Sequence, residues 1–135
     1  MKPNPYEKYK NNAIFTASGE ELTLMLYDGA LKFCNQALTA LEGKDYERTN
    51  ELIIKVQSIV QELQLTLDMQ YEISHQLNSL YDYIYRRLLD ANSKKDSAIL
   101  IEARDYIRNF RDTWRDAIKL ARQGQKPAAV PAGVR

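Results

Sequence analysis

The chain has 135 residues, with 19 basic residues against 18 acidic ones, one cysteine, one histidine and a formal net charge of +1. This length is typical of one domain with its own hydrophobic core, and the near-zero charge excludes a global field that attracts nucleic acid or an anionic membrane. A single cysteine cannot form an internal disulfide, and no apolar run approaches the roughly 18 residues of a membrane span. Because the start of the chain has no signal-peptide pattern either, we expect a cytoplasmic protein with no membrane insertion.

Both ends of the chain are predicted to lie outside the regular structure. Residues 1–17 form an N-terminal arm in which Pro3 and Pro5 oppose helix formation. The arm carries apolar side chains that would anchor it, namely Tyr6, Tyr9, Ile14 and Phe15. Residues 124–135 are small, contain proline and show no periodic pattern, which is typical of a short disordered C-terminal tail.

Four amphipathic helices are predicted between these ends. The first begins at the capping box of Ser18 and Glu21 and ends before Gly43, and Asp45 and Asp96 cap the second and fourth helices. Apolar residues at spacings of three and four continue through each segment. The predicted helices cover residues 18–42, 45–68, 72–92 and 96–122. Because the connections are short, we expect an all-α fold, an antiparallel up-down-up-down four-helix bundle over residues 18–123.

Residue types that carry catalysis or bind metals are nearly absent. The one histidine, His75, forms with Glu72 a single Glu-x-x-His pair, whereas helical di-iron sites need two. Cys34 lies in an apolar helical run without an activating neighbour, which favours a buried thiol. We therefore expect no enzyme, no metal site and no cofactor.

The last predicted helix carries a row of arginines with aspartates beside them. These residues are Arg104, Arg108, Arg111, Arg115 and Arg122, with Asp105, Asp112 and Asp116. Because the opposite charges are close enough to pair locally, the row is typical of a solvated helix face. We expect no nucleic-acid partner.

The first predicted helix has more apolar surface than its own fold obviously requires. One stripe contains Leu22 and Leu26, and a second contains Leu24 and Leu38, roughly 150° round the helix. A helix on one side of a small bundle needs an arc only modestly wider than about 100°. The surplus predicts a face that binds an amphipathic segment of another protein. The residues that we assign to it, here and on the other helices, are Leu24, Tyr27, Leu31, Ile54, Leu65 and Tyr83.

Three blocks of the sequence closely resemble one protein family. They are residues 21–33 (ELTLMLYDGALKF), 80–92 (LYDYIYRRLLDAN) and 110–114 (FRDTW). The Asn4-Pro5-Tyr6 triplet followed by Tyr9 adds a match in the arm, so the resemblance runs in order over about residues 4–121. On these motifs the chain is identified as a member of the FliS family of flagellar secretion chaperones.

The resemblance implies a cytoplasmic export chaperone that binds the disordered C-terminal region of flagellin. Such a protein prevents premature polymerisation of flagellin and delivers it to the flagellar type III secretion apparatus, with no cofactor. The resemblance also implies that Tyr6, Tyr9 and Ile14 belong to an N-terminal cap over the binding groove, and that Tyr9 docks on the export-gate protein. The alternative is a structural homo-oligomeric helical bundle without a chaperone role, which would use the same apolar surplus for weak self-association.

Overall fold

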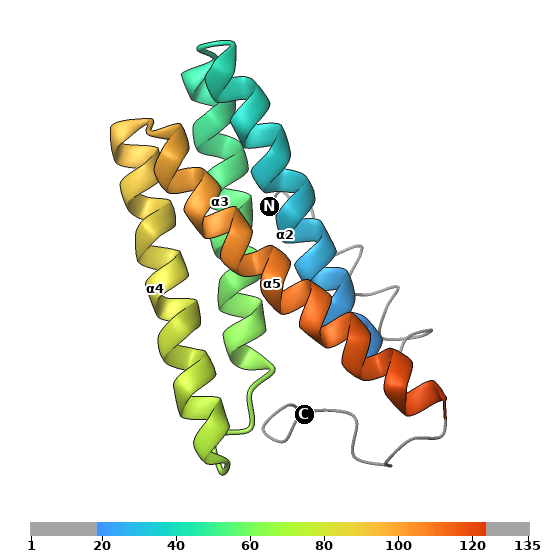
Figure 1. Ribbon diagram of the computed structural model, residues 1–135. Helices are drawn as coiled ribbons and strands as arrows, with labels where there is room; N and C mark the ends of the chain where they lie inside the picture. Colours follow the sequence, from blue (N-terminus) through green and yellow to red (C-terminus); the bar gives the residue numbers. More distant parts are fainter. Residues whose placement is uncertain (1–18, 124–135) are drawn as a thin grey trace, which may run out of the picture.

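The computed structural model describes residues 19–123, and the regular elements within this range are four helices, so this part of the chain is all-α as predicted. They are α2 (Gly19–Glu42), α3 (Tyr46–Leu65), α4 (Glu72–Lys94) and α5 (Ser97–Arg122). The α2–α3 and α4–α5 turns lie at one end of the molecule, and the α3–α4 connection lies at the other (Figure 1). The predicted arm with Tyr6, Tyr9 and Ile14, the Ser18 cap and the predicted tail lie outside the described residues.

The two turns at the shared end are built alike, by a lysine followed by an aspartate. Lys44 and Lys95 adopt the left-handed conformation, with φ of 59° and 49°. The backbone N–H groups of Asp45 and Asp96 then bond to a carbonyl five residues earlier, at 2.9 and 3.0 Å. Both aspartates also accept backbone N–H groups of the following helix, which confirms them as caps. The first helix ends before Gly43 as predicted, but the residue in the left-handed conformation is Lys44.

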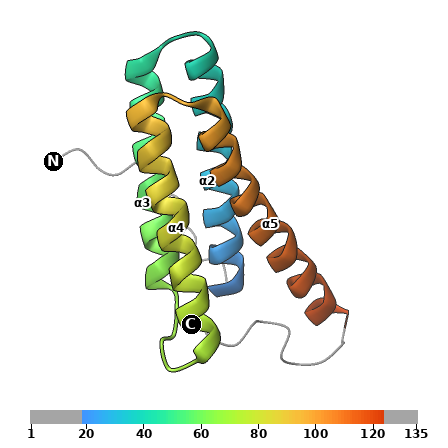
Figure 2. The same ribbon diagram turned by 60° about the vertical axis from the view of Figure 1, so that its left-hand side comes forward.

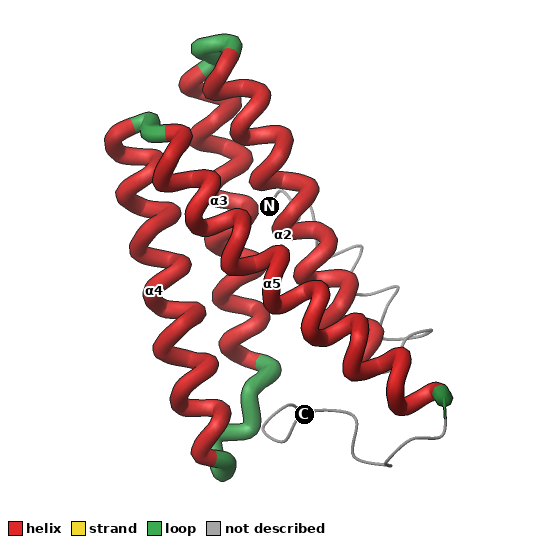
Figure 3. The backbone as a smooth tube through the Cα atoms, viewed as in Figure 1, coloured by secondary structure: helices red, strands yellow, loops and turns green. Residues whose placement is uncertain are grey.

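The connection between α3 and α4 begins earlier than predicted, because α3 ends at Leu65 and not at residue 68. Thr66 donates twice to Leu63 O, from its hydroxyl at 2.6 Å and from its backbone N–H at 3.1 Å. These short-range bonds tighten the last turn and end the helix. Leu67 still lies in the core, at 2% exposed. Figure 3 shows this connection as a longer loop than the two turns at the opposite end.

One hydrophobic core fills the space between the helices. Its largest side chains include Leu52, Ile53, Ile59, Leu63, Ile84, Leu88, Leu100 and Ile107. The helices contact one another in a ring, α2 with α3 and α5, and α4 with the same two helices. As a result, α2 and α4 lie diagonally across the core. Cys34 is fully buried in it as expected, and burial raises the pKa of the thiol to about 12, so the thiol is unreactive in the folded protein.

Polar side chains recur at heptad intervals along the interface of α3 and α4. Asn92 Nδ2 donates to Asn50 Oδ1 at 2.7 Å, and Gln64 Nε2 donates to Asn78 Oδ1 at 3.1 Å. The partners lie 14 residues apart on each helix, 50 to 64 and 78 to 92, in opposite order, so α3 and α4 run in opposite directions. Gln57 is buried midway between Asn50 and Gln64. Polar pairs at such positions specify one register of two helices, and they do so at some cost in stability.

The arginine row of α5 is partly a helix–helix contact. Arg111 lies 2.6 Å from Asp112, in agreement with the predicted local pairing. The same guanidinium also lies 3.1 Å from Asp28 of α2, and Arg122 lies 2.8 Å from Glu21. The prediction of a solvated face was therefore incomplete, because this side of α5 packs along α2.

We expect Asn92→Leu or Asn50→Leu alone to lower the free energy of unfolding by about 1 kcal/mol, because each leaves a part-buried amide without its partner. The double variant should recover part of the combined loss, since an apolar pair then replaces the hydrogen bond. Urea unfolding of the three variants measures the coupling between the two sites. Strictly additive losses would show that the pair does not act as a unit.

Candidate functional site

A pocket of about 310 Å³ opens at the end of the molecule that holds the α3–α4 connection. At this end α5 has diverged from α4, which it meets at the opposite turn (Figures 1 and 2). The described residues that line the pocket are Thr23, Tyr27, Thr66, Ile73, Leu77, Tyr81, Asn109, Phe110, Thr113 and Trp114. All of them are uncharged, and most of the lining is apolar or aromatic, which is typical of a site for an apolar segment of a ligand.

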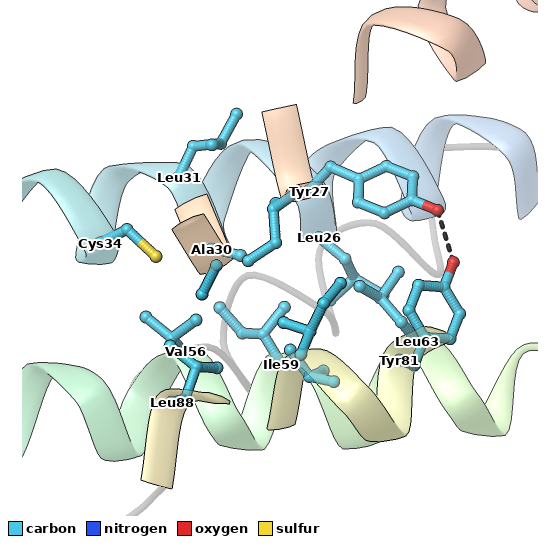
Figure 4. Packing of buried hydrophobic residues seen from close by; sticks show 14 of the residues in the cluster. Leu26, Tyr27, Ala30, Leu31, Cys34, Val56, Ile59, Leu63, Tyr81 and Leu88 are labelled. Carbon is cyan, nitrogen blue, oxygen red and sulfur yellow. Dashed lines mark hydrogen bonds between the residues drawn. The ribbon is translucent and has the colours of Figure 1, made fainter. Parts of the chain in front are cut away.

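Three aromatic rings from three helices form one wall of the pocket. The hydroxyls of Tyr27 and Tyr81 are hydrogen-bonded at 2.5 Å, and Figure 4 shows the two rings meeting across the core. The Phe110 ring lies nearly parallel to Tyr27, with centroids 6.2 Å apart, and it is tilted against Tyr81 at 5.6 Å. Because α2 and α4 lie diagonally across the core, this cluster joins two helices that are not neighbours in the ring.

The tyrosine pair stays neutral in the folded protein. Burial raises the pKa of Tyr81 to about 12, and burial together with the neighbouring Tyr81 raises the pKa of Tyr27 well above its ordinary value. Both side chains are 3% exposed. At physiological pH the two hydroxyls therefore act only as hydrogen-bonding groups.

Trp114 closes the pocket on the side of α2. Its indole Nε1 donates to the backbone carbonyl of Glu20 at 2.8 Å, and the side chain is 6% exposed. Glu20 lies in the first turn of α2, where carbonyls are already used by the helix, so this bond fixes the ring against the helix start. The ring thereby holds the C-terminal half of α5 beside α2 while α5 stays apart from α4.

The structure corrects the assignment of Leu31 to a surface that binds a partner. Leu31 is 6% exposed and belongs to the core, and Leu24 is partly buried against the same core. Tyr27 is buried as well, although it lines the pocket. The physical reason is that α2 packs on both α3 and α5, so two apolar stripes are required by the fold itself. Most of the apolar surface of α2 is therefore used by the fold and is not available to a partner.

The remaining predicted residues lie away from the pocket. Ile54 and Leu65 are 49% and 69% exposed on α3. Their spacing of eleven residues is close to three helical turns, so they lie on one outer face of the helix. Their role in binding a partner stays a prediction.

Tyr83 ties α4 to α5. Its hydroxyl donates to Glu102 Oε2 at 2.9 Å, and Arg87 Nε donates to the other oxygen of this carboxylate at 2.7 Å. Hydrogen bonding to Arg87, and then to Tyr83, lowers the pKa of Glu102. The Tyr83 ring also packs edge-on against Tyr106 at 5.8 Å. These contacts occupy the hydroxyl of Tyr83 within the fold.

Most of the pocket lining was missed at the level of sequence. Tyr81, Phe110 and Trp114 have helical core spacing, which indicates the bundle interior and gives no sign of a pocket. Their signal was present in residues 80–92 and 110–114, two of the blocks that carry the family resemblance. These two blocks therefore supply three of the large aromatic side chains that line the pocket.

The described residues include few groups of the kind that bind metal ions. Between residues 19 and 123, no group of three or more His, Cys, Asp or Glu side chains is placed to hold a metal ion. His75 Nε2 lies 3.0 Å from the backbone oxygen of Met69, at the start of α4. Among the same residues, no helix combines the length and the apolar character that crossing a membrane requires.

Comparisons with known proteins agree over nearly the whole chain. The family model described as "Flagellar protein FliS" matches residues 2–121. The chain is similar to the flagellar secretion chaperone FliS of Bacillus subtilis (strain 168), with 48% identity over 120 residues, which is 89% of this chain and 90% of the relative. It is also similar to the proteins of that name from Salmonella typhimurium, at 34% over 107 residues, and Escherichia coli (strain K12), at 29% over 110 residues. These matches cover 77% and 79% of this chain, and 79% and 81% of the two relatives.

The tyrosine pair predicts a loss of stability at alkaline pH. A tyrosine in the unfolded chain ionises near pH 10, whereas Tyr81 in the fold keeps its proton to about pH 12. Below pH 10 the hydroxyl of Tyr81 is neutral in both states, and its contribution to the free energy of unfolding is fully present. As the pH rises toward 12 the unfolded chain ionises first, which lowers the free energy of unfolding by up to about 3 kcal/mol for this group. We expect Tyr27→Phe/Tyr81→Phe to lose less stability over that range in urea unfolding. Tyr46→Phe, at an exposed position, is the control. Parallel curves for all variants would contradict the assignment.

The corrected burial of Leu31 predicts a contrast between two aspartate substitutions. Leu31→Asp should lower the free energy of unfolding by about 3 kcal/mol or more, because it places a carboxylate in the core. Ile54→Asp should change it by no more than about 0.5 kcal/mol, since Ile54 is half exposed. Thermal unfolding followed by circular dichroism measures both. A normal melting temperature for Leu31→Asp would contradict the burial of Leu31 in the core.

Proposed function

Because this chain belongs to the FliS family of flagellar secretion chaperones, we propose that it binds the C-terminal region of flagellin in the cytoplasm and keeps it from polymerising prematurely. It then delivers flagellin to the flagellar type III secretion apparatus. The observation that carries the proposal is the family match over residues 2–121. The scaffold is the antiparallel up-down-up-down four-helix bundle expected from the short connections. The function needs no enzymatic activity, cofactor, metal ion or nucleic acid.

The pocket between α2, α4 and α5 supports binding of a segment that is unfolded when alone. Such a segment loses conformational entropy when it orders on the chaperone, so it needs extensive apolar contact. Burial contributes roughly 25 cal/mol per Å² of apolar surface. A pocket of about 310 Å³ therefore serves as one anchoring point and not as the whole site. We propose that exposed apolar residues on α3, Ile54 and Leu65, extend the contact surface.

The N-terminal arm is proposed to regulate access to the binding surface. Residues 1–17 carry Tyr6, Tyr9 and Ile14, which suit a segment that covers an apolar groove and is displaced by flagellin. In this scheme Tyr9 also contacts the export-gate protein. Displacement of the arm by flagellin would thus free Tyr9 to contact the export-gate protein, which couples flagellin binding to flagellin delivery.

The proposed binding is tested at a pocket residue, with calorimetry against the C-terminal segment of flagellin from the same bacterium. Leu77→Asp should weaken binding by at least about tenfold, because its carboxylate would lose hydration in an uncharged pocket. The matched control is Leu89→Asp on the same helix, at a residue that is 48% exposed. A folded Leu77→Asp variant with wild-type affinity would exclude the pocket from the binding site.

The same measurement tests the arm and the alternative function. A chain without residues 1–16 should bind the flagellin segment as well as the full chain, or more tightly, if the arm covers the groove. A large loss of affinity would make the arm part of the site. Light scattering with and without flagellin addresses the alternative, since a dimer that flagellin leaves unchanged would favour a structural homo-oligomer.

A further inference from the structure

One hydroxyl in the pocket lining makes no hydrogen bond to the described residues. Thr23 lies in the second turn of α2 and is 2% exposed, and its Oγ1 atom is buried without a hydrogen-bond partner among residues 19–123. A buried hydroxyl in this state costs about 1–3 kcal/mol of stability. Such a group is rare in a native core unless something else pairs with it.

The neighbouring tyrosine pair also has unused hydrogen-bonding capacity. Tyr27 and Tyr81 carry one O–H each, and the bond between them uses only one of the two. The second O–H has no acceptor among the described residues. Both tyrosines and Thr23 line the same pocket, so the residues that carry the unused groups belong to one lining.

We propose that this polar part of the pocket lining binds the side-chain amide of an asparagine or glutamine in the flagellin segment. This inference rests on the proposed function. The amide oxygen accepts the free tyrosine O–H, and the amide NH₂ donates to Thr23 Oγ1. Threonine in a helix has two accessible χ1 rotamers, so rotation about Cα–Cβ brings the hydroxyl from its buried position toward the pocket. Phe110 and Leu77 pack on the apolar stem of the bound residue.

The chemistry of the lining favours a neutral polar group over the two other classes of side chain. A charged group would be buried without a counter-ion, because the described lining is uncharged. A purely apolar group would leave Thr23 and the tyrosine O–H unpaired in the complex. An amide supplies both a donor and an acceptor and carries no charge. The pocket therefore discriminates by hydrogen bonding as well as by shape.

The test is Thr23→Val in the full chain, which removes the hydroxyl and keeps the shape of the side chain. The free variant should be at least as stable as the wild type, because an unpaired buried hydroxyl is lost. Its affinity for the C-terminal flagellin segment should fall about 5- to 10-fold, the effect of one hydrogen bond. The control is Thr49→Val, at a buried threonine whose hydroxyl already donates to Asp45 O at 2.7 Å. That variant should lose stability and keep its affinity.

The client side of the contact is tested by replacing each asparagine and glutamine of the flagellin segment with leucine. One of these replacements should weaken binding to the wild-type chaperone and have no further effect on Thr23→Val. If Thr23→Val does not fold, Thr23→Ser and Thr23→Ala take its place, and only the serine variant should retain affinity. Wild-type affinity of folded Thr23→Val would overturn this inference alone. Failure of the wild-type chain to bind flagellin would instead contradict the proposed function on which this inference rests.

Discussion

The hydrogen bond between the Tyr27 and Tyr81 hydroxyls crosses the diagonal between α2 and α4, and the shape of the pocket depends on it. The two helices are not neighbours in the ring, so this bond links them across the core. At the end of the molecule with the α3–α4 connection, α5 diverges from α4 (Figure 1), and Phe110 and Trp114 of α5 line the pocket there. The tyrosine pair adds two buried, neutral side chains to the lining of the pocket.

Each helix interface satisfies a different physical requirement. The α3–α4 interface includes polar pairs at heptad positions, which specify the alignment of the two helices. The α2–α5 interface combines apolar packing with ion pairs such as Arg111 with Asp28. The Trp114 bond to the backbone of Glu20 holds α5 on α2 at the pocket end. The polar pairs and the ion pairs thus lie outside the pocket, and Trp114 attaches α5 to α2 through a neutral hydrogen bond, so the described lining carries no charge.

This division suits a chaperone of an unfolded segment. The pocket offers dispersion and hydrogen-bonding capacity without charge, so the binding that we propose would depend on fit and pairing more than on ionic strength. An unpaired hydroxyl at Thr23 makes the free protein less stable than it would otherwise be. Proteins retain such local costs at functional sites, and here the cost lies in the pocket lining.

The sequence by itself determined the four helices, the aspartate caps, the buried Cys34 and the family, because spacing, capping and short motifs are local properties of the chain. It did not determine which apolar residues stay available to a partner. Leu31 and Ile54 look alike in the sequence, yet one is 6% exposed and the other 49%. Each helix packs on two neighbours, and the difference depends on which way the side chain faces: Leu31 packs into the core, whereas Ile54 lies on the outer face of α3. The tertiary structure alone decided where α5 diverges, and so where the pocket lies.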